Sequence, residues 1–525
     1  MLSGAVSGFE YKHSNHDIDL YDLTGRLIAR TDKLGHQENF IYNSTGQLES
    51  VTDGFGNSLA FTYNLNGLLE TLTAPDGIYS YGYGVNVNLE TVTDPDTTSK
   101  TYLYEDSRFP YALTGVIDEN GSRFATWSYD IQGRAVASEH ANGADLTTLA
   151  YNADGSTTVT NPLGKQTTYH FTDAFGAKKL SQIEGHASAN CAAGIKDITY
   201  DPNGFKDLVT DFEGNITDYD YDTRGLEVTR TEAVGTPQTR TITTQWHAEF
   251  RIPSKIIAPG KTTDFVYNPQ GQVLSRSETD TTSQTVPYST QGQKRTWTYT
   301  YISVAGVQLL ETVDGPRTDV NDVTTFTYDT QGNVDTVSNG LNQATTLSSY
   351  NGRGLPGTIL DANLVQTDLT YDARGRLKTR TLKSPSGDIT TRFDYDNVGQ
   401  LTQVNLPLGG SLGYEYDAAH RLTAIKNNLG ERIDYTLDNA GNRTVEAVSA
   451  ADTTLIRTHS QLFDELSRLI QSIGADNQLT DYAYDRNDNL VSINDPLQNQ
   501  TIQVFDPLNR LMTVTDALNG ISTYD

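Results

Sequence analysis

The sequence predicts an all-β protein made of a long array of antiparallel β-hairpins. A short unit, Tyr-Asp-x-x-Gly-Arg-Leu, recurs from one end of the chain to the other. Its copies lie about 21 residues apart, a period that indicates an array of identical supersecondary units. The 525 residues include 30 Tyr and 44 Gly, and Tyr- and Thr-rich segments alternate with clusters of Gly, Asn and Asp. This composition favours strands joined by tight turns over helices.

One unit, Tyr371-Asp372-Ala373-Arg374-Gly375-Arg376-Leu377, shows why the repeat predicts a hairpin. Asp at the first position and Gly at the fourth are typical of a type I turn, with Gly in the left-handed region that it enters without steric cost. A three-residue loop of this kind places Tyr371 opposite Leu377 and Asp372 opposite Arg376. Each such cross-strand pair contributes roughly 0.2–1 kcal/mol.

The same frame defines the structural positions that we predict along the chain. The expected last strand residue and the expected left-handed glycine of each clear repeat are Tyr21 and Gly25, Tyr42 and Gly46, Tyr63 and Gly67, Tyr129 and Gly133, Tyr221 and Gly225, Tyr267 and Gly271, Tyr328 and Gly332, Tyr371 and Gly375, and Tyr395 and Gly399. In late repeats Leu437, Phe463 and Phe505 occupy the tyrosine position. A second turn, as in Asp211-Phe212-Glu213-Gly214-Asn215, ends each repeat. Turns at both ends of every strand pair predict a continuous meander.

We expect a single array over residues 1–525, because no Ser/Pro-rich linker or charge run divides the chain. The period is interrupted near 105–128, 172–199 and 229–262, which we interpret as insertions or degenerate repeats. The segment 463–473 could be a weak helix, but it also fits the repeat frame, and we favour the repeat. One further period after Phe505 falls just beyond Asp525. The chain is therefore expected to stop within a repeat, as a fragment of a longer protein would.

Charge, cysteine content and hydropathy argue against several partners, cross-links and membrane segments. The formal net charge is −28, which argues against nucleic-acid binding and against an anionic membrane surface. The lone Cys191 excludes an internal disulfide framework. The N-terminus lacks a basic region followed by an apolar run, so no signal peptide is visible, and no stretch approaches the roughly 20 apolar residues of a membrane span. Export would need a route without a visible signal peptide.

Four groups of residues are candidates for chemistry. Gly409-Gly410-Ser411-Leu412-Gly413 fits the nucleophile pattern Gly-x-Ser-x-Gly, but a repeat strand follows it where that pattern needs a helix, which favours a connector turn. Asp218, Asp220 and Asp222 are expected to alternate along one strand, either as paired carboxylates of a glycosidase or, as we favour, as a solvated strand face.

Neither of the other two groups predicts a site. His13 and His16 are the only close histidine pair, with no matching cluster for a metal. Cys191 has no evident histidine partner and is expected to be an unreactive thiol. We therefore assign no catalytic residue, no cofactor and no metal site, and we expect the chain not to be an enzyme.

The Tyr-Asp-x-x-Gly-Arg-Leu units resemble the YD repeats of the RHS family, which includes bacterial Rhs polymorphic toxins, C-subunits of insecticidal toxin complexes and animal teneurins. The resemblance covers about residues 17–525, and the run Tyr104–Pro110 followed by Trp127–Asp130 is most similar to bacterial Rhs proteins. It implies a β-sheet that spirals into a hollow, cocoon-like shell. Winding would also cover strand edges that otherwise invite aggregation.

The resemblance further implies a function. In that family the shell encloses a C-terminal toxin and keeps it inactive until a secretion or delivery machinery exports it. The protein would then be cytoplasmic before export and later secreted or held at the cell surface. The family's self-cleaving core motif is absent, since the Asp-Pro pairs at 495–496 and 506–507 are ordinary turns. A cell-surface module that binds glycans through its tyrosines is the alternative, although the pairing of Tyr with Leu favours a structural role.

Overall fold

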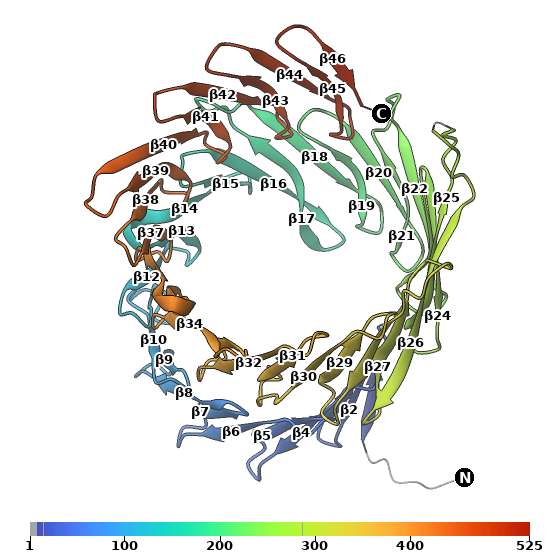
Figure 1. Ribbon diagram of the computed structural model, residues 1–525, viewed down its shortest axis with the longest axis vertical. Helices are drawn as coiled ribbons and strands as arrows, with labels where there is room; N and C mark the ends of the chain where they lie inside the picture. The colour runs from blue at the N-terminus through green and yellow to red at the C-terminus, as the bar shows by residue number, and fades with distance from the viewer. Residues whose placement is uncertain (1–7, 14, 286, 525) are drawn as a thin grey trace. The chain divides into compact units, whose positions relative to one another are not determined.

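The computed structural model describes residues 8–524 apart from 14 and 286 (Figure 1). The chain divides into two compact units, each built from two segments that are far apart in sequence. Unit 1 comprises Met1–Ser99 and Ile242–Phe393, and unit 2 comprises Lys100–Thr241 and Asp394–Asp525. The described residues form 46 β-strands and two short 3₁₀ turns, with no α-helix among them. The predicted all-β class is confirmed.

The strands are mostly four to nine residues long, the length that the repeat period allows. The first segment of unit 1 holds β1 (Phe9–Lys12), β2 (Ile18–Tyr21), β3 (Leu27–Thr31), β4 (Gln37–Tyr42), β5 (Leu48–Asp53), β6 (Ser58–Tyr63), β7 (Leu69–Ala74), β8 (Gly77–Tyr83) and β9 (Leu89–Thr93). Its second segment holds β22 (Arg240–Trp246), β23 (Pro253–Ala258), β24 (Lys261–Tyr267), β25 (Val273–Asp280), β26 (Lys294–Val304), β27 (Val307–Asp314), β28 (Thr324–Tyr328), β29 (Val334–Ser338), β30 (Ala344–Ser348), β31 (Thr358–Leu360), β32 (Gln366–Tyr371), β33 (Leu377–Leu382) and β34 (Ile389–Tyr395).

Unit 2 continues the same pattern of short paired strands. Its first segment holds β10 (Ser99–Leu103), β11 (Gly115–Ile117), β12 (Arg123–Tyr129), β13 (Ala135–His140), η1 (Ala141–Gly143), β14 (Ala144–Tyr151), β15 (Thr157–Thr160), β16 (Gln166–Ala174), β17 (Ala177–Gly185), β18 (Gly194–Tyr200), β19 (Lys206–Thr210), β20 (Ile216–Tyr221) and β21 (Glu227–Glu232). Its second segment holds β35 (Leu401–Asn405), η2 (Pro407–Gly409), β36 (Ser411–Tyr416), β37 (Leu422–Asn427), β38 (Arg432–Leu437), β39 (Arg443–Ser449), β40 (Leu455–Phe463), β41 (Leu469–Ile473), β42 (Leu479–Tyr484), β43 (Leu490–Asn494), β44 (Gln500–Phe505), β45 (Leu511–Thr515) and β46 (Ile521–Thr523).

Strands that follow one another in sequence pair antiparallel, as a meander requires. In β32 and β33 the pairing runs from Thr367 opposite Leu382 to Tyr371 opposite Leu377, and it shifts by one residue between Thr370 and Tyr371. The shift is a β-bulge that recurs just before the repeat aromatic, for instance between Ile41 and Tyr42. An extra residue beside a left-handed turn position increases the local twist of the strand pair.

The sheet buries few side chains completely. Val307 in unit 1 and Ala424 in unit 2 are fully buried, but most strand residues of both units remain half-buried. A sheet whose two faces are not both packed against another layer leaves its side chains partly exposed. Hydrogen bonds and cross-strand pairs, more than a filled core, therefore hold these strands together.

Within unit 1 the two segments meet through their turns. The backbone amide of Gln308 donates a 2.9 Å hydrogen bond to the carbonyl oxygen of Leu34. The Phe55 ring lies against Gly332, where a Cβ would sit 2.6 Å from the ring. Leu34 and Phe55 both lie in the turns that end a repeat, the second turns defined above. Leu34 contacts a strand of the later segment, and Phe55 contacts the Tyr-Asp turn that holds Gly332.

Unit 2 shows the same interlocking of turns. Asn161 Nδ2 donates a 2.7 Å hydrogen bond to the carbonyl oxygen of Glu465, which lies 304 positions later. The backbone amide of Arg486 donates a 2.8 Å bond to Glu213 Oε1, 273 positions earlier. In each unit, therefore, second turns of one segment contact Tyr-Asp turns of the other segment, which in unit 2 lie 273 to 304 residues later in the chain.

The irregular regions are longer hairpins and loops. Near 105–128 a loop joins β10 to β11 and is held by an ion pair of 2.8 Å between Arg123 and Glu105. Near 172–199 the long hairpin of β16 and β17 is followed by the loop that carries Cys191. Near 229–262, β21 to β23 are joined by loops rather than by the repeat turn. Residues 463–473 form a turn and a strand, as the repeat frame predicts.

Candidate functional site

The Tyr-Asp turn is the feature that recurs throughout both units. In the turn after β32, Asp372 Oδ1 accepts hydrogen bonds of 2.9 Å from the backbone amides of Arg374 and Arg376. Asp372 Oδ2 accepts a third, of 2.6 Å, from Arg376 Nε. The backbone amide of Gly375 donates to the Asp372 carbonyl oxygen at 2.9 Å, and Gly375 has φ +79°. The aspartate thus caps the turn and pairs with the arginine at once.

The predicted repeat positions share this geometry. Each of the nine tyrosines is the last residue of its strand, and each of the nine glycines has a φ between +71° and +101°. In the left-handed region a side chain is strained, which explains the preference for Gly. Where Gly is absent, the same position still takes a positive φ, as at His420 (65°), Ser467 (63°) and Asn509 (57°).

In most repeats the tyrosine hydroxyl links its hairpin to the one before it. Tyr42 donates to the Leu27 carbonyl oxygen at 2.9 Å, and Tyr63 donates to that of Leu48 at 2.8 Å. The same bond is made by Tyr129 to Leu113 (2.7 Å), Tyr267 to Pro253 (2.6 Å), Tyr328 to Leu310 (2.6 Å) and Tyr371 to Pro356 (3.0 Å). Burial raises the pKa of the Tyr371 hydroxyl, which keeps it a donor. Sequence reasoning missed this bond, although the excess of Tyr (30) over Phe (16) indicated it.

The arginine after the left-handed position, which is Gly133 or His420 in the two examples here, contacts the following repeat. Arg134 stacks over the ring of Tyr151, with its Cζ 4.1 Å from the ring centroid. Arg421 Nη1 donates a 2.8 Å hydrogen bond to the Asp438 carbonyl oxygen, the first residue of the next turn. An arginine over an aromatic ring gains about 0.5–1 kcal/mol at an exposed site. The tyrosine therefore contacts the preceding repeat, and the arginine contacts the following one.

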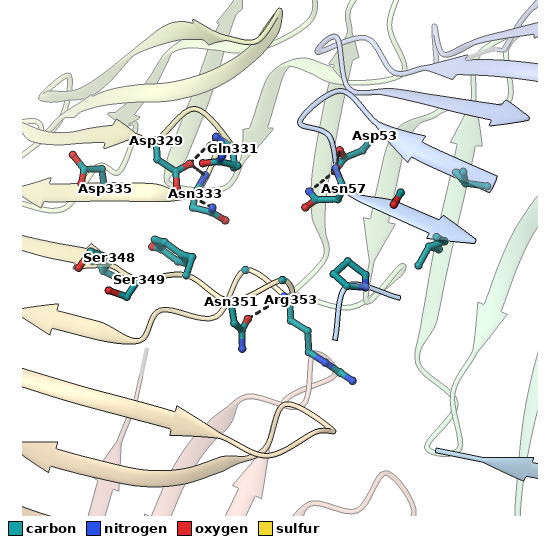
Figure 2. Close-up of a pocket in the computed structure, with 18 of the residues that line it drawn as sticks. Asp53, Asn57, Asp329, Gln331, Asn333, Asp335, Ser348, Ser349, Asn351 and Arg353 are labelled. Carbon is teal, nitrogen blue, oxygen red and sulfur yellow. Dashed lines mark hydrogen bonds between the residues drawn. The ribbon is translucent and has the colours of Figure 1, made fainter. Parts of the chain in front are cut away.

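A cavity of about 860 Å³ lies between the two segments of unit 1 (Figure 2). The turns supply polar side chains to its walls, beside apolar ones such as Leu59 and Leu347. Asn57 Nδ2 donates to Asp53 Oδ2 at 2.7 Å, and Asn333 Nδ2 donates to Asp329 Oδ2 at 3.0 Å. Figure 2 shows Gln331, Ser348, Ser349 and Asn351 around the same space. Sequence reasoning did not predict this cavity, because it needs contacts between distant repeats.

The predicted carboxylate row is wrong in one respect. Asp218 and Asp220 lie on β20, but Asp222 lies after the strand and caps the Tyr-Asp turn. Its carboxylate accepts the backbone amide of Leu226 at 3.0 Å, and this bond, with those from Arg224, outweighs burial and lowers the pKa of Asp222. The Tyr-Asp turn begins at Asp222, so the strand alternation that we expected for all three carboxylates ends one residue earlier, at Tyr221. The three carboxylates therefore form no common face.

The other candidate groups have structural surroundings. Ser411 begins the strand β36, separated by one residue from the short turn η2, so the strand-to-helix elbow of a nucleophilic serine is not formed. His13 Nε2 lies 2.9 Å from Asp19 Oδ2, and His16 Nε2 lies 3.3 Å from the Glu249 carbonyl oxygen. Both histidines of this pair are thus engaged by different partners.

Cys191 is buried in unit 2. Its Sγ lies 3.4 Å from Glu465 Oε2 and 3.7 Å from Arg468 Nη2. Burial raises the pKa of the Cys191 thiol, which disfavours the reactive thiolate. Among the described residues no group of three or more His, Cys, Asp and Glu side chains is arranged to hold a metal ion. No helix of the described chain is long and apolar enough to cross a membrane.

No curated protein sequence matches the chain. Solved structures similar to it include the TcdB2-TccC3-Cdc42 and TcdB2-TccC3 crystal structures, each at 13% identity and a TM-score of 0.47, over 96% of this chain and 32% of theirs. A third is the Photorhabdus luminescens Tc holotoxin pore with a TccC3 mutation, at 13% identity and a TM-score of 0.47, over 98% of this chain and 32% of that one.

This chain therefore spans about a third of the solved chains that it resembles. A family model described as the teneurin YD-shell matches residues 12–161 and 254–447, which together make up more than half of the chain. These residues include eight of the nine Tyr-Asp turns whose Tyr and Gly positions the sequence predicts. The chain belongs to the teneurin YD-shell family.

Proposed function

We propose that this chain is part of the wall of a protein shell that encloses a polypeptide cargo and separates it from solvent. The interlocking of turns within each unit is the observation that carries the proposal. In unit 2 the second turn at Asp211 meets the Tyr-Asp turn at Asn487, whose Nδ2 donates a 2.7 Å hydrogen bond to Asp211 Oδ2. Such contacts join successive rows of hairpins into a continuous surface.

The thin sheet supports a wall rather than a packed globule. A domain that folds around its own core buries many large apolar side chains. Here the fully buried side chains are few in each unit, and Asp19 and Asp464 are among the largest of them. Asp464 caps a turn and pairs with Arg468 Nε at 2.6 Å. This buried carboxylate therefore stabilises a hairpin turn and does not belong to an apolar core.

We extend the proposal to the cargo and its delivery. The family resemblance of the Tyr-Asp units supports a toxin polypeptide as cargo and a delivery machinery as partner. The protein would then be secreted or held at the cell surface, and its own part would be structural, with no reaction of its own. Family membership supports this role, since the matching model is named for a shell.

Protease protection of the cargo tests the proposal. The protein would be purified from the cells that produce it, together with the polypeptides that accompany it, and digested with a nonspecific protease while mass spectrometry follows each polypeptide. The proposal predicts that the cargo resists digestion until denaturant unfolds the β-sheet, and that an unfolded protein added as a control is digested at once. A cargo digested as fast as the added control would contradict it.

A further inference from the structure

The repeat at residues 344–357 departs from its neighbours in unit 1. In the flanking repeats Tyr328 and Tyr371 end their strands, but β30 stops at Ser348, and Tyr350 lies outside it. Ser349 takes a φ of +58°, which is unfavourable for a residue other than Gly. The backbone amide of Gly357 donates to the carbonyl oxygens of both Ser348 (3.0 Å) and Ser349 (3.1 Å). Strain of this kind persists where the surrounding structure requires it.

The departure coincides with the cavity shown in Figure 2, which Ser348, Ser349 and Tyr350 all line. The cavity measures about 860 Å³, whereas another cavity of unit 1, beside Gly260, measures about 310 Å³. Small-molecule sites usually occupy about 300–1,000 Å³. The irregular repeat therefore opens a space of ligand size in a sheet that is otherwise regular there.

Several polar groups of the cavity have hydrogen-bonding capacity to spare. Within the described chain, the Ser348 and Ser349 hydroxyls have no hydrogen-bond partner. Asn351 uses its Oδ1 to accept the backbone amides of Arg353 and Leu355, which leaves both protons of its Nδ2 available. Gln331 accepts the Thr330 hydroxyl with its Oε1 at 3.2 Å, and its Nε2 is likewise available. Amides and hydroxyls can both donate and accept, as the hydroxyls of a ligand do.

The charges of the cavity select against anions. Its cation, Arg353, is ion-paired with Asp76 of the first segment. Four carboxylates line the walls, and Asp53 and Asp329 are held by the amides of Asn57 and Asn333. The other two, Glu38 and Asp335, are exposed. An anionic ligand would be repelled, and a neutral ligand would meet carboxylates that accept its hydroxyl protons.

We propose that this cavity binds a neutral oligosaccharide. The hydroxyls of the sugar would bond to Gln331, Asn351 and the two serines. The Tyr350 hydroxyl already donates to the Val334 carbonyl oxygen at 2.5 Å, so its half-buried ring is the part that remains for stacking on the sugar. The site belongs to unit 1 and does not depend on a cargo, so enclosure of a polypeptide and binding of a sugar stand or fall separately.

Binding measurements on the whole chain test the site. Neutral tri- to pentasaccharides would be screened on an array, and the best would be titrated by calorimetry beside its sialylated counterpart. Gln331→Ala should weaken binding about fivefold, the effect of one lost hydrogen bond. Ser349→Gly should weaken it too, while thermal unfolding stays unchanged or shifts upward because Gly relieves the strained φ.

A matched control is Gln270→Ala, at the same turn position in a repeat that does not line the cavity. It should leave the affinity unchanged. The proposal is overturned if no neutral oligosaccharide on the array binds, if Gln331→Ala and Ser349→Gly both bind like the parent, or if the sialylated sugar binds more tightly than the neutral one.

Discussion

The hydroxyl of Tyr42 donates a hydrogen bond of 2.9 Å to the carbonyl oxygen of Leu27, fifteen residues earlier. Leu27 is also the residue that lies opposite Tyr21, the aromatic of the preceding repeat. One backbone group thus joins the cross-strand pair of one hairpin to the aromatic of the next. Repetition of this contact gives the meander a connection from hairpin to hairpin beyond its strand hydrogen bonds.

Loss of that hydroxyl should weaken the connection locally. In Tyr416→Phe the bond of 2.9 Å to the Leu401 carbonyl oxygen disappears while the ring remains. We expect a loss of about 1 kcal/mol, the net value of one hydrogen bond. Hydrogen exchange would show faster opening of amides in β35 and β36. The exposed Tyr111→Phe should leave exchange unchanged, and equal protection in Tyr416→Phe and the parent would show that the hydroxyl bond is unimportant.

The turn glycine should be sensitive to substitution. Gly375 has φ +79°, and a Cβ there would lie 2.8 Å from Arg353 Cδ. Gly375→Val should destabilise its hairpin by about 1–3 kcal/mol, because a β-branched residue is strained at positive φ. Gly25→Asn is the control, since that position is open and Asn tolerates the left-handed region. Denaturant unfolding followed by exchange of the amides in β32 and β33 is the measurement, and parent-like protection would refute the expectation.

Much of this hairpin was predictable from the sequence, because its determinants are local. The pairing of Tyr371 with Leu377 and the left-handed Gly375 both follow from the order of residues around one turn. The capping role of Asp222 was missed because alternation along the strand was extended one residue too far. Contacts such as Asn161 with Glu465 were beyond prediction, since they depend on how many repeats separate two rows of turns.

Interlocking turns should tolerate the loss of an ion pair poorly. The Arg374 side chain is 13% exposed and pairs with Asp94 and Asp96 of the other segment of unit 1. Arg374→Met should destabilise this contact by about 2–3 kcal/mol, because partly buried Asp94 loses its cation. The loss stays below that of a fully broken buried pair, because Arg376 still lies 3.3 Å from Asp96. Arg317→Met, at a pair that is 60% and 67% exposed, should cost at most about 1 kcal/mol. Urea unfolding of both variants checks the difference, and equal midpoints would contradict it.

Acid should weaken the strand pair around Glu415. Hydrogen bonds from Arg432 and then Lys426 lower the pKa of Glu415 from its ordinary 4.5 to about 2. A carboxylate whose pKa is depressed on folding stabilises the protein above its unfolded pKa, and this stabilisation is lost as the pH falls from about 4.5 towards 2. The side chain is 37% exposed, so solvent screening limits the effect to less than about 1 kcal/mol.

Glu415→Gln tests this dependence. Its urea midpoint should lie below that of the parent at pH 6, and the difference should shrink as the pH approaches 2. The control is Glu70→Gln at an exposed position on β7, whose urea midpoint should equal that of the parent at pH 6. A constant difference between Glu415→Gln and the parent across this range would rule out the ionised Glu415 as the cause.

The proposal that hairpin rows form an enclosing wall is tested most directly by an electron cryo-microscopy map of the protein purified with its accompanying polypeptides. We predict density for a polypeptide cargo surrounded by the β-sheet, with the turn of Glu465 in contact with that of Asn161. Cargo density on the outside of the sheet, or turns of Asn161 and Glu465 that lie apart, would contradict the account.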